Sequence, residues 1–112
     1  MTTRDVMAKA MSEDELLSCV IDLARALGYR VAHFRPARTA KGWRTAMQGD
    51  PGWPDLVMAK DGRVIFAELK SQRGRMSHEQ WVWFAALASG CYLWRPSDWL
   101  SGEVELILKG EA

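Results

Sequence analysis

Apolar and polar positions follow two rhythms along the chain, and each rhythm predicts its own kind of element. From residue 12 to residue 27 the apolar positions recur at helical spacing. Ser12 and Glu15 fit a capping box at the start of this segment, and Gly28 fits its end. We therefore expect a helix from residue 13 to about residue 27. Its apolar stripe consists of Leu16, Leu17, Val20, Ala24 and Leu27.

Shorter apolar runs predict strands at residues 29–34, 55–59, 64–69 and 91–94. Asp61-Gly62 lies between the second and third runs and predicts a tight hairpin. The third run is almost entirely apolar, which is typical of a central strand. A second capped helix is expected to begin at Ser77 and to end at Gly90. Trp81 lies with its apolar positions and is expected in the core, with Trp83 partly exposed.

The remaining segments carry weaker patterns. Residues 1–11 show faint helical periodicity and are expected to form an N-terminal extension, at most a frayed helix. Residues 36–54 are rich in glycine and proline and predict a long irregular loop, which in a compact domain is usually functional or disordered. Residues 99–100 predict a turn, and residues 104–108 predict a helix or a strand. The order α-β-β-β-α-β predicts one α/β domain over residues 12–112, with a mixed sheet flanked by helices.

Composition excludes several classes of protein. A chain of 112 residues with 48% hydrophobic and 26% charged residues is typical of an ordinary soluble globular domain, not a disordered one. No apolar run reaches the length of a membrane span, and residues 1–9 lack the apolar core of a signal peptide. We therefore expect a cytoplasmic protein without membrane association. In that compartment Cys19 and Cys91 are expected to be free thiols.

Positive charge is concentrated locally although the net charge is only +1. Residues 30–48 contain five cations and no acid, and residues 70–75 contain three more cations. Such patches can neutralise phosphates, or they can simply be solvated charged loops, and the sequence leaves both interpretations open. The cations are Arg30, Arg35, Arg38, Lys41 and Arg44, followed by Lys70, Arg73 and Arg75.

Three charged residues on the predicted hairpin point to chemistry. Asp55 stands where a Gly/Pro loop enters a strand, and Glu68 and Lys70 lie two apart on the next strand. Antiparallel pairing brings the two carboxylates and the ammonium together at one end of the sheet. Two adjacent carboxylates suit Mg²⁺ or Mn²⁺, which would polarise a phosphate and acidify a bound water. The alternative is a cross-strand ion pair on a surface hairpin.

Two further residues could join this site. Glu13 lies at the N-terminal end of the first helix's apolar stripe and is expected to face inward. A carboxylate there needs a partner, although the helix dipole alone could also account for it. Gln80 begins the second helix one loop after Lys70. It could support the site, or it could only complete the capping box of Ser77.

A set of short motifs along the chain is specific enough to indicate a protein family. The motifs are Ser12-Glu13, Gly52-Trp53-Pro54-Asp55-Leu56, Phe66-Ala67-Glu68-Leu69-Lys70-Ser71, Gly74 and Gln80. They resemble the VRR-NUC family of the PD-(D/E)xK nuclease superfamily, and the resemblance extends over about residues 12–100. His33-Phe34-Arg35 and residues 93–98 further resemble small stand-alone members from phages and bacteria.

The resemblance implies a restriction-endonuclease-like core and metal-dependent phosphodiester hydrolysis that leaves a 5′-phosphate and a 3′-hydroxyl. It implies that Asp55, Glu68 and the carbonyl of Leu69 bind the Mg²⁺ or Mn²⁺ ion. It implies that Lys70 positions or activates the attacking water.

The resemblance also implies that Glu13 is a helical acid near the metal-bound water and that Gln80 is a helical glutamine supporting the site. One position departs from many relatives, because Leu17 stands where they have a glutamine. Stand-alone members are similar to Holliday-junction resolvases and are often dimeric. A homodimer acting on branched DNA, such as a four-way junction, is therefore the expected form.

The leading hypothesis is thus an endonuclease that acts on DNA. The loop with Arg35, Arg38, Lys41 and Arg44 would hold the backbone, with Arg73 and Arg75 beside the scissile phosphate. His33 could contact phosphate or be a structural strand residue. Trp43 and Trp53 could stack on bases or anchor the loop. The alternatives are a non-catalytic nucleic-acid-binding module on the same fold and a structural phage accessory protein.

Overall fold

The computed structural model of the chain describes residues 1–34, 37–39, 42–44 and 48–111, with residues 37–39 and 42–44 described through their backbone only. Eleven elements occur in these ranges. The helices are α1 (Thr3–Ala10), α2 (Glu13–Ala26), α3 (His78–Leu87), α4 (Pro96–Leu100) and α5 (Glu103–Lys109). The strands are β1 (Arg30–His33), β2 (Ala37–Thr39), β3 (Gly42–Arg44), β4 (Leu56–Lys60), β5 (Arg63–Leu69) and β6 (Cys91–Trp94).

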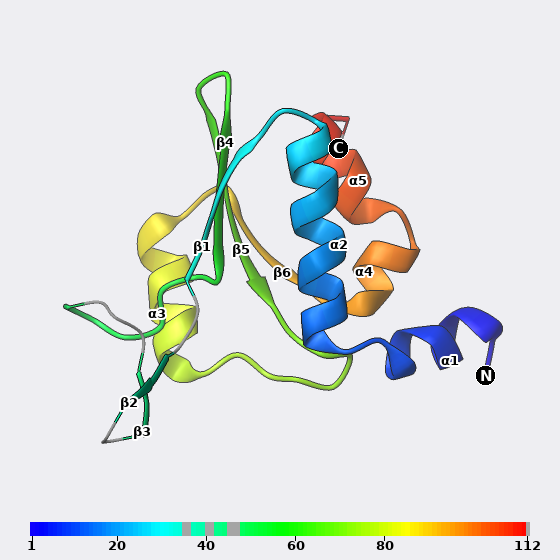
Figure 1. Ribbon diagram of the computed structural model, residues 1–112, viewed down its shortest axis with the longest axis horizontal. Coiled ribbons are helices and arrows are strands. Elements are labelled where there is room, and N and C mark those ends of the chain that lie inside the picture. Colours follow the sequence, from blue (N-terminus) through cyan, green and yellow to red (C-terminus); the bar gives the residue numbers. More distant parts are fainter. Residues whose placement is uncertain (35–36, 40–41, 45–47, 112) are drawn as a thin grey trace.

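A four-stranded mixed sheet in the order β1-β4-β5-β6 forms the centre of the fold. β1, β4 and β5 pair antiparallel, and β6 pairs parallel to β5 after the crossover through α3. Helices α2, α4 and α5 lie on one side of the sheet and α3 lies on the other (Figure 1). The predicted α/β class with a mixed sheet flanked by helices is therefore confirmed, and β5 is a central strand as predicted.

The tight turn between β4 and β5 sets the register that matters for function. Asp61 and Gly62 have φ angles of 50° and 80°, the left-handed values that a two-residue hairpin turn with native twist requires. The resulting register places Leu56 opposite Ala67. Asp55 directly precedes Leu56, and Glu68 directly follows Ala67. Both acids therefore lie at the same end of the hairpin.

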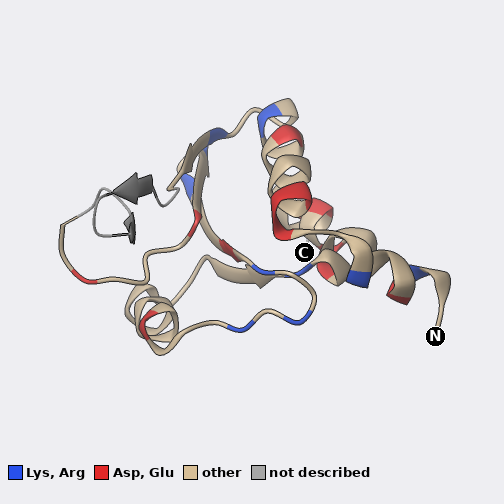
Figure 2. Ribbon diagram, turned by 60° about the horizontal axis from the view of Figure 1, so that its bottom comes forward, with Lys and Arg blue, Asp and Glu red and all other residues tan. Residues whose placement is uncertain are grey.

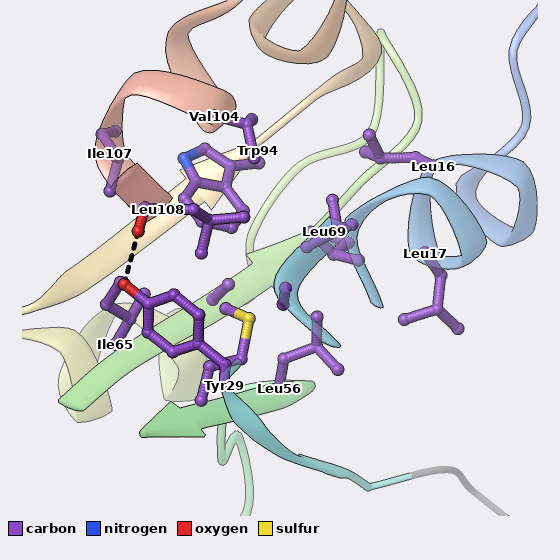
Figure 3. Close-up of a cluster of buried hydrophobic side chains, with 14 residues drawn as sticks. Leu16, Leu17, Tyr29, Leu56, Ile65, Leu69, Trp94, Val104, Ile107 and Leu108 are labelled. Atoms are coloured by element: carbon purple, nitrogen blue, oxygen red, sulfur yellow. Dashed lines mark hydrogen bonds between the residues drawn. The ribbon is translucent and has the colours of Figure 1, made fainter. Parts of the chain in front are cut away.

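The main core lies between the sheet and helices α2 and α5 (Figure 3). Leu16, Val20 and Ala24 of α2 are buried against sheet residues, as the helical stripe predicted. Trp94 of β6 is among the largest fully buried side chains. The Tyr29 hydroxyl donates a 2.6 Å hydrogen bond to the carbonyl of Leu108, which ties the start of β1 to α5. The core therefore fixes α2 and the sheet rigidly relative to one another.

On the other face of the sheet, α3 packs through a smaller aromatic cluster. The Trp53 ring makes edge-on contacts with Phe34, Phe66 and Trp83, at centroid distances of 6.1, 5.6 and 4.8 Å. The expectation that Trp81 is a core residue is wrong, because its side chain is 53% exposed. Residues 81–84 are all apolar, so the sequence pattern did not show which side of α3 faces the sheet.

Other parts of the chain also differ from the expectations. Residues 3–10 form a complete helix with a Thr2/Asp5 capping box, and Ala8 is buried where α1 packs against α4. The segment predicted as a long irregular loop contains the β2–β3 hairpin, and residues 99–100 end the helix α4 instead of forming a turn. Residues 104–108 are helical. The four predicted strands (β1, β4, β5 and β6) and the limits of α2 agree with the prediction within one residue, whereas α3 ends at Leu87, three residues before Gly90.

Two smaller expectations concern the cysteines and the membrane. Cys19 and Cys91 are free thiols, as predicted. None of the helices in the described part of the chain is long and apolar enough to cross a membrane.

Candidate active site

Asp55 is fixed at the end of the sheet by backbone hydrogen bonds on both of its sides. Its Oδ2 accepts a 2.9 Å hydrogen bond from the backbone N–H of Leu69, the last residue of β5. Its own carbonyl accepts a 2.9 Å hydrogen bond from the N–H of Phe34, just beyond β1. These two hydrogen bonds hold Asp55 in place where the chain leaves the loop after Pro54. Its carboxylate therefore lies at the ends of three adjacent strands, β1, β4 and β5.

Glu68 is the buried acid of the site, with only 1% of its surface exposed. Its Oε2 accepts a 2.9 Å hydrogen bond from Gln80 Nε2 and lies 3.2 Å from Lys70 Nζ. Its Oε1 is buried and has no hydrogen-bond partner among the residues that the structure describes. A buried carboxylate oxygen without a partner is costly, and such an atom ordinarily meets a water, a cation or a ligand.

The electrostatic environment of Glu68 also disfavours an ionised carboxylate that has no cation beside it. Burial, repulsion from the adjacent Asp55 carboxylate and the hydrogen bond that the protonated carboxyl can share with Asp55 together raise the pKa of this group to about 8. Lys70 lowers the same pKa, but not enough to cancel these three effects. In the absence of a cation, the two neighbouring carboxylates therefore resist being ionised together near neutral pH.

Gln80 makes both the helix-capping contacts and a contact with Glu68. Its backbone N–H donates to Ser77 Oγ at 3.2 Å, and its Oε1 accepts from the Ser77 N–H at 2.7 Å, which completes the capping box of α3. Its Nε2 is left free to donate to Glu68 Oε2. One side chain thus ties the first turn of α3 to the buried acid of β5.

Glu13 lies at the mouth of a small cavity and not on the buried stripe. The cavity has a volume of about 140 Å³, and Glu13, His33, Asp55 and Leu69 are among its lining residues. The expectation that Glu13 faces inward holds only in part, because its side chain is exposed to solvent and yet lines the same cavity as Asp55. Partial burial and the carboxylate of Asp55 raise the pKa of Glu13, while Lys70 lowers it.

The structure describes some of the remaining candidate residues in full and others only in part or not at all. His33 is exposed and lines the same cavity as Asp55. Arg73 and Arg75 are exposed on the loop between β5 and α3, whose blue segments are visible in Figure 2. Arg38 and Arg44 lie on β2 and β3, but their side chains are outside the described part of the chain. Arg35 and Lys41 are outside the described residues altogether.

Gly52 is a positioning residue that the sequence did not single out. Its φ is +97°, and a Cβ atom at this position would lie 2.6 Å from the carbonyl carbon of Glu79 and 2.8 Å from the nitrogen of Gln80. The loop leading to Asp55 therefore rests directly on the peptide group that precedes Gln80. A Gly-Trp-Pro-Asp string hints at a constrained loop, but nothing in it indicates which helix the glycine approaches.

The donor set fits a hard divalent cation completed by water. Within the described ranges, no three His, Cys, Asp or Glu side chains gather into a ready metal cage. Mg²⁺ does not need one, because it commonly takes one or two carboxylates and keeps several waters. Asp55 and the partnerless Oε1 of Glu68 supply such carboxylates, and Leu69 lines the same cavity as Asp55. A cation between them would also relieve the repulsion that raises the pKa of Glu68.

Comparison of the chain with protein-family models, with curated proteins and with solved structures found no match. The resemblance to the VRR-NUC family therefore rests on the motifs themselves. The geometry around Glu68 is accordingly the main guide to the chemistry of this chain.

Proposed function

We propose that the protein is a metal-dependent endonuclease that hydrolyses phosphodiester bonds in DNA. The observation that supports this most directly is the buried Glu68, whose Oε1 lacks a partner among the described residues and whose pKa is raised to about 8 beside Asp55. A cross-strand ion pair on a surface hairpin would instead leave both oxygens exposed to water and the pKa of the acid near its ordinary value. The proposal includes a restriction-endonuclease-like core built on the mixed sheet.

Asp55, Glu68 and the carbonyl of Leu69 would hold the ion, Mg²⁺ or Mn²⁺. When bound, such an ion supplies polarisation of the scissile phosphate and acidification of a bound water. The protein's own contribution is to keep both carboxylates in place before substrate arrives. Asp55 is held by the Leu69 N–H, and Glu68 by Gln80 and Lys70.

Lys70 is suited to act on the reacting atoms. Its side chain is 18% exposed, and its backbone N–H donates to the Trp94 carbonyl at 3.1 Å, which fixes its origin. Its Nζ can donate a hydrogen bond to the oxygen of the attacking water or to a phosphate oxygen, where negative charge develops. Glu13, across the cavity mouth, has a raised pKa and can accept a proton or a hydrogen bond from water there.

The substrate and setting belong to the same proposal. The arginines and lysine of residues 35–44, together with Arg73 and Arg75, would hold the DNA backbone, with His33 beside the cavity. Branched DNA such as a four-way junction is the proposed preferred form, and a homodimer would present two such sites to it. The cytoplasm of a bacterial or phage-infected cell would be its location.

The experiment that tests this proposal is cleavage of a supercoiled plasmid and of a synthetic four-way junction. We expect cutting with Mg²⁺ or Mn²⁺ and none with a chelator, and labelled ends should carry 5′-phosphates. Binding without cutting in either metal would instead indicate the non-catalytic nucleic-acid-binding module. Neither binding nor cutting would leave a structural protein. The two substrates also show whether the junction is preferred to plain duplex.

A further inference from the structure

A second cavity, open and polar, lies beside the loop that follows Lys70. It has a volume of about 430 Å³ and is lined by Lys9 of α1 and by the loop residues Ser71, Gln72 and Arg73. Two of these four side chains are cationic, one is a hydroxyl and one is an amide, and none is acidic. This composition suits an anion with several oxygen acceptors, which is the character of a phosphate.

The loop side of this cleft is held in place by hydrogen bonds. A turn is closed by the Gly74 N–H donating to the Ser71 carbonyl at 3.0 Å. Gln72 both donates to Ser97 Oγ at 3.1 Å and accepts from the Ser97 N–H at 2.9 Å, and Arg95 Nη2 donates to the Gly74 carbonyl at 3.0 Å. These bonds anchor the loop to the start of α4, so its side of the cleft is preformed.

The other side is provided by α1, which packs on the same short helix. Ala8 is buried there, while its neighbour Lys9 is exposed. Among the described residues, neither Lys9 nor Arg73 forms an ion pair, and the one recorded contact of the Lys9 ammonium is a weak 3.9 Å approach to the sulfur of Met1. Both cations are therefore available to a ligand.

We propose that this cleft binds a backbone phosphate of the DNA strand whose scissile bond lies at the candidate active site. The inference rests on the proposed nuclease function and extends it to α1. Ser71 directly follows Lys70, so a strand that places one phosphate at Lys70 runs on over the loop toward Lys9 and Arg73. α1 then forms part of the proposed DNA-binding surface. Contacts of this kind position the strand without reading its sequence.

The test is DNA affinity in chelator, measured by fluorescence anisotropy over a range of salt concentrations, for wild type, Lys9→Ala and Arg73→Ala. Arg4→Ala is the matched control, because Arg4 is an exposed cation on the same helix that does not line the cleft. Each cleft variant should lower the slope of log affinity against log salt by about one and weaken binding about threefold to tenfold. Arg4→Ala should do neither.

Cleavage kinetics distinguish positioning from chemistry. In Lys9→Ala KM should rise while kcat at saturating DNA stays within about twofold of wild type. Lys9→Ala binding DNA with the affinity and salt slope of Arg4→Ala would overturn the cleft proposal, even if wild type cuts DNA normally. A wild-type protein that binds no DNA would end the proposed function itself, which is a separate outcome.

Discussion

Glu68 occupies a position that a strand in a hydrophobic sheet would ordinarily fill with an apolar residue. Its neighbours Ala67 and Leu69 are buried, and they point toward the main core, while Glu68 faces α3. Three polar groups converge on this one carboxyl group: Asp55, Lys70 and Gln80. Evolution of a stable fold alone would favour removing such a charge, since buried ion pairs contribute little net stability.

A pH dependence of stability is expected at this scale for the metal-free protein. The carboxyl of Glu68 has a pKa of about 8 in the folded chain against an ordinary value of 4.5, so the folded state binds more protons between these values. Stability in chelator should therefore fall as pH rises from about 4.5 to about 8, by linkage. Thermal denaturation of wild type and Glu68→Gln measures this directly.

The uncharged glutamine should flatten that decline, and Mg²⁺ should reduce it in wild type by favouring the ionised carboxylate. Wild type and Glu68→Gln losing stability in parallel over this range would show that another group is responsible.

At the scale of elements, the site is assembled where a loop, a hairpin and two helices meet. The Gly52 backbone rests on the first turn of α3, and Gln80 in that turn reaches Glu68 on β5. A change at the contact between Gly52 and α3 should therefore displace Gln80 and, through its hydrogen bond, the Glu68 carboxylate. The close approach leaves no space for even one added carbon atom.

Gly52→Ala should destabilise the protein by about 1–3 kcal/mol and reduce cleavage strongly, because both φ strain and a backbone clash oppose it. Gly49→Ala is a matched control: Gly49 has a φ of +108°, but nothing lies within 4 Å of an added Cβ. It should show only the smaller effect of backbone strain. Thermal denaturation and cleavage assays compare the two variants, and equal losses would argue against a role for the Gly52 contact.

Local chemistry made some elements predictable from the sequence. Ser12 and Ser77 each begin a helix with a capping box, and Asp61-Gly62 forms the tight turn, because these signals act over a few residues. The juxtaposition of Asp55 with Glu68 followed from that turn. The sequence therefore indicated Asp55 and Glu68 as candidate metal ligands, because it predicted the hairpin that brings them together.

Other features depended on tertiary contacts that no local pattern encodes. α1 is held by Ala8 against α4, which its weak periodicity did not indicate. Trp83 is less exposed than Trp81 because only Trp83 packs against Trp53, a residue far from both in the sequence. The approach of Gly52 to α3 and the exposed position of Glu13 likewise appear only once the helices are placed on the sheet.

At the scale of the whole molecule, the loop after β5 carries exposed cations, while Glu68 of the candidate site is buried. A net charge of +1 gives no general attraction to nucleic acid, so the proposed DNA binding would have to come from local groups. The cations of residues 35–44 and of the loop after β5 are the available ones in sequence. The proposed DNA-binding surface would consist of these cations beside the acidic candidate site of Asp55 and Glu68.

Arg38→Ala and Arg44→Ala should each weaken DNA binding and lower the salt slope by about one, because each would lose one phosphate contact. Anisotropy titrations over several salt concentrations measure both quantities. Lys109→Ala is the control, since Lys109 pairs with Glu105 on α5. A slope unchanged from wild type would show that the β2–β3 segment does not hold the backbone.

The central claim is that Glu68 belongs to a catalytic metal site, and one side-by-side cleavage measurement tests it. Glu68→Gln and the control Glu105→Gln each remove one carboxylate charge, the first at the site and the second on the exposed face of α5. With Mg²⁺ or Mn²⁺, we predict that Glu105→Gln cuts DNA like wild type. Glu68→Gln should cut at least about a hundredfold more slowly, which corresponds to about 2.7 kcal/mol of lost transition-state stabilisation, while binding DNA as tightly or more tightly. Cleavage by a folded Glu68→Gln at the wild-type rate would contradict the account.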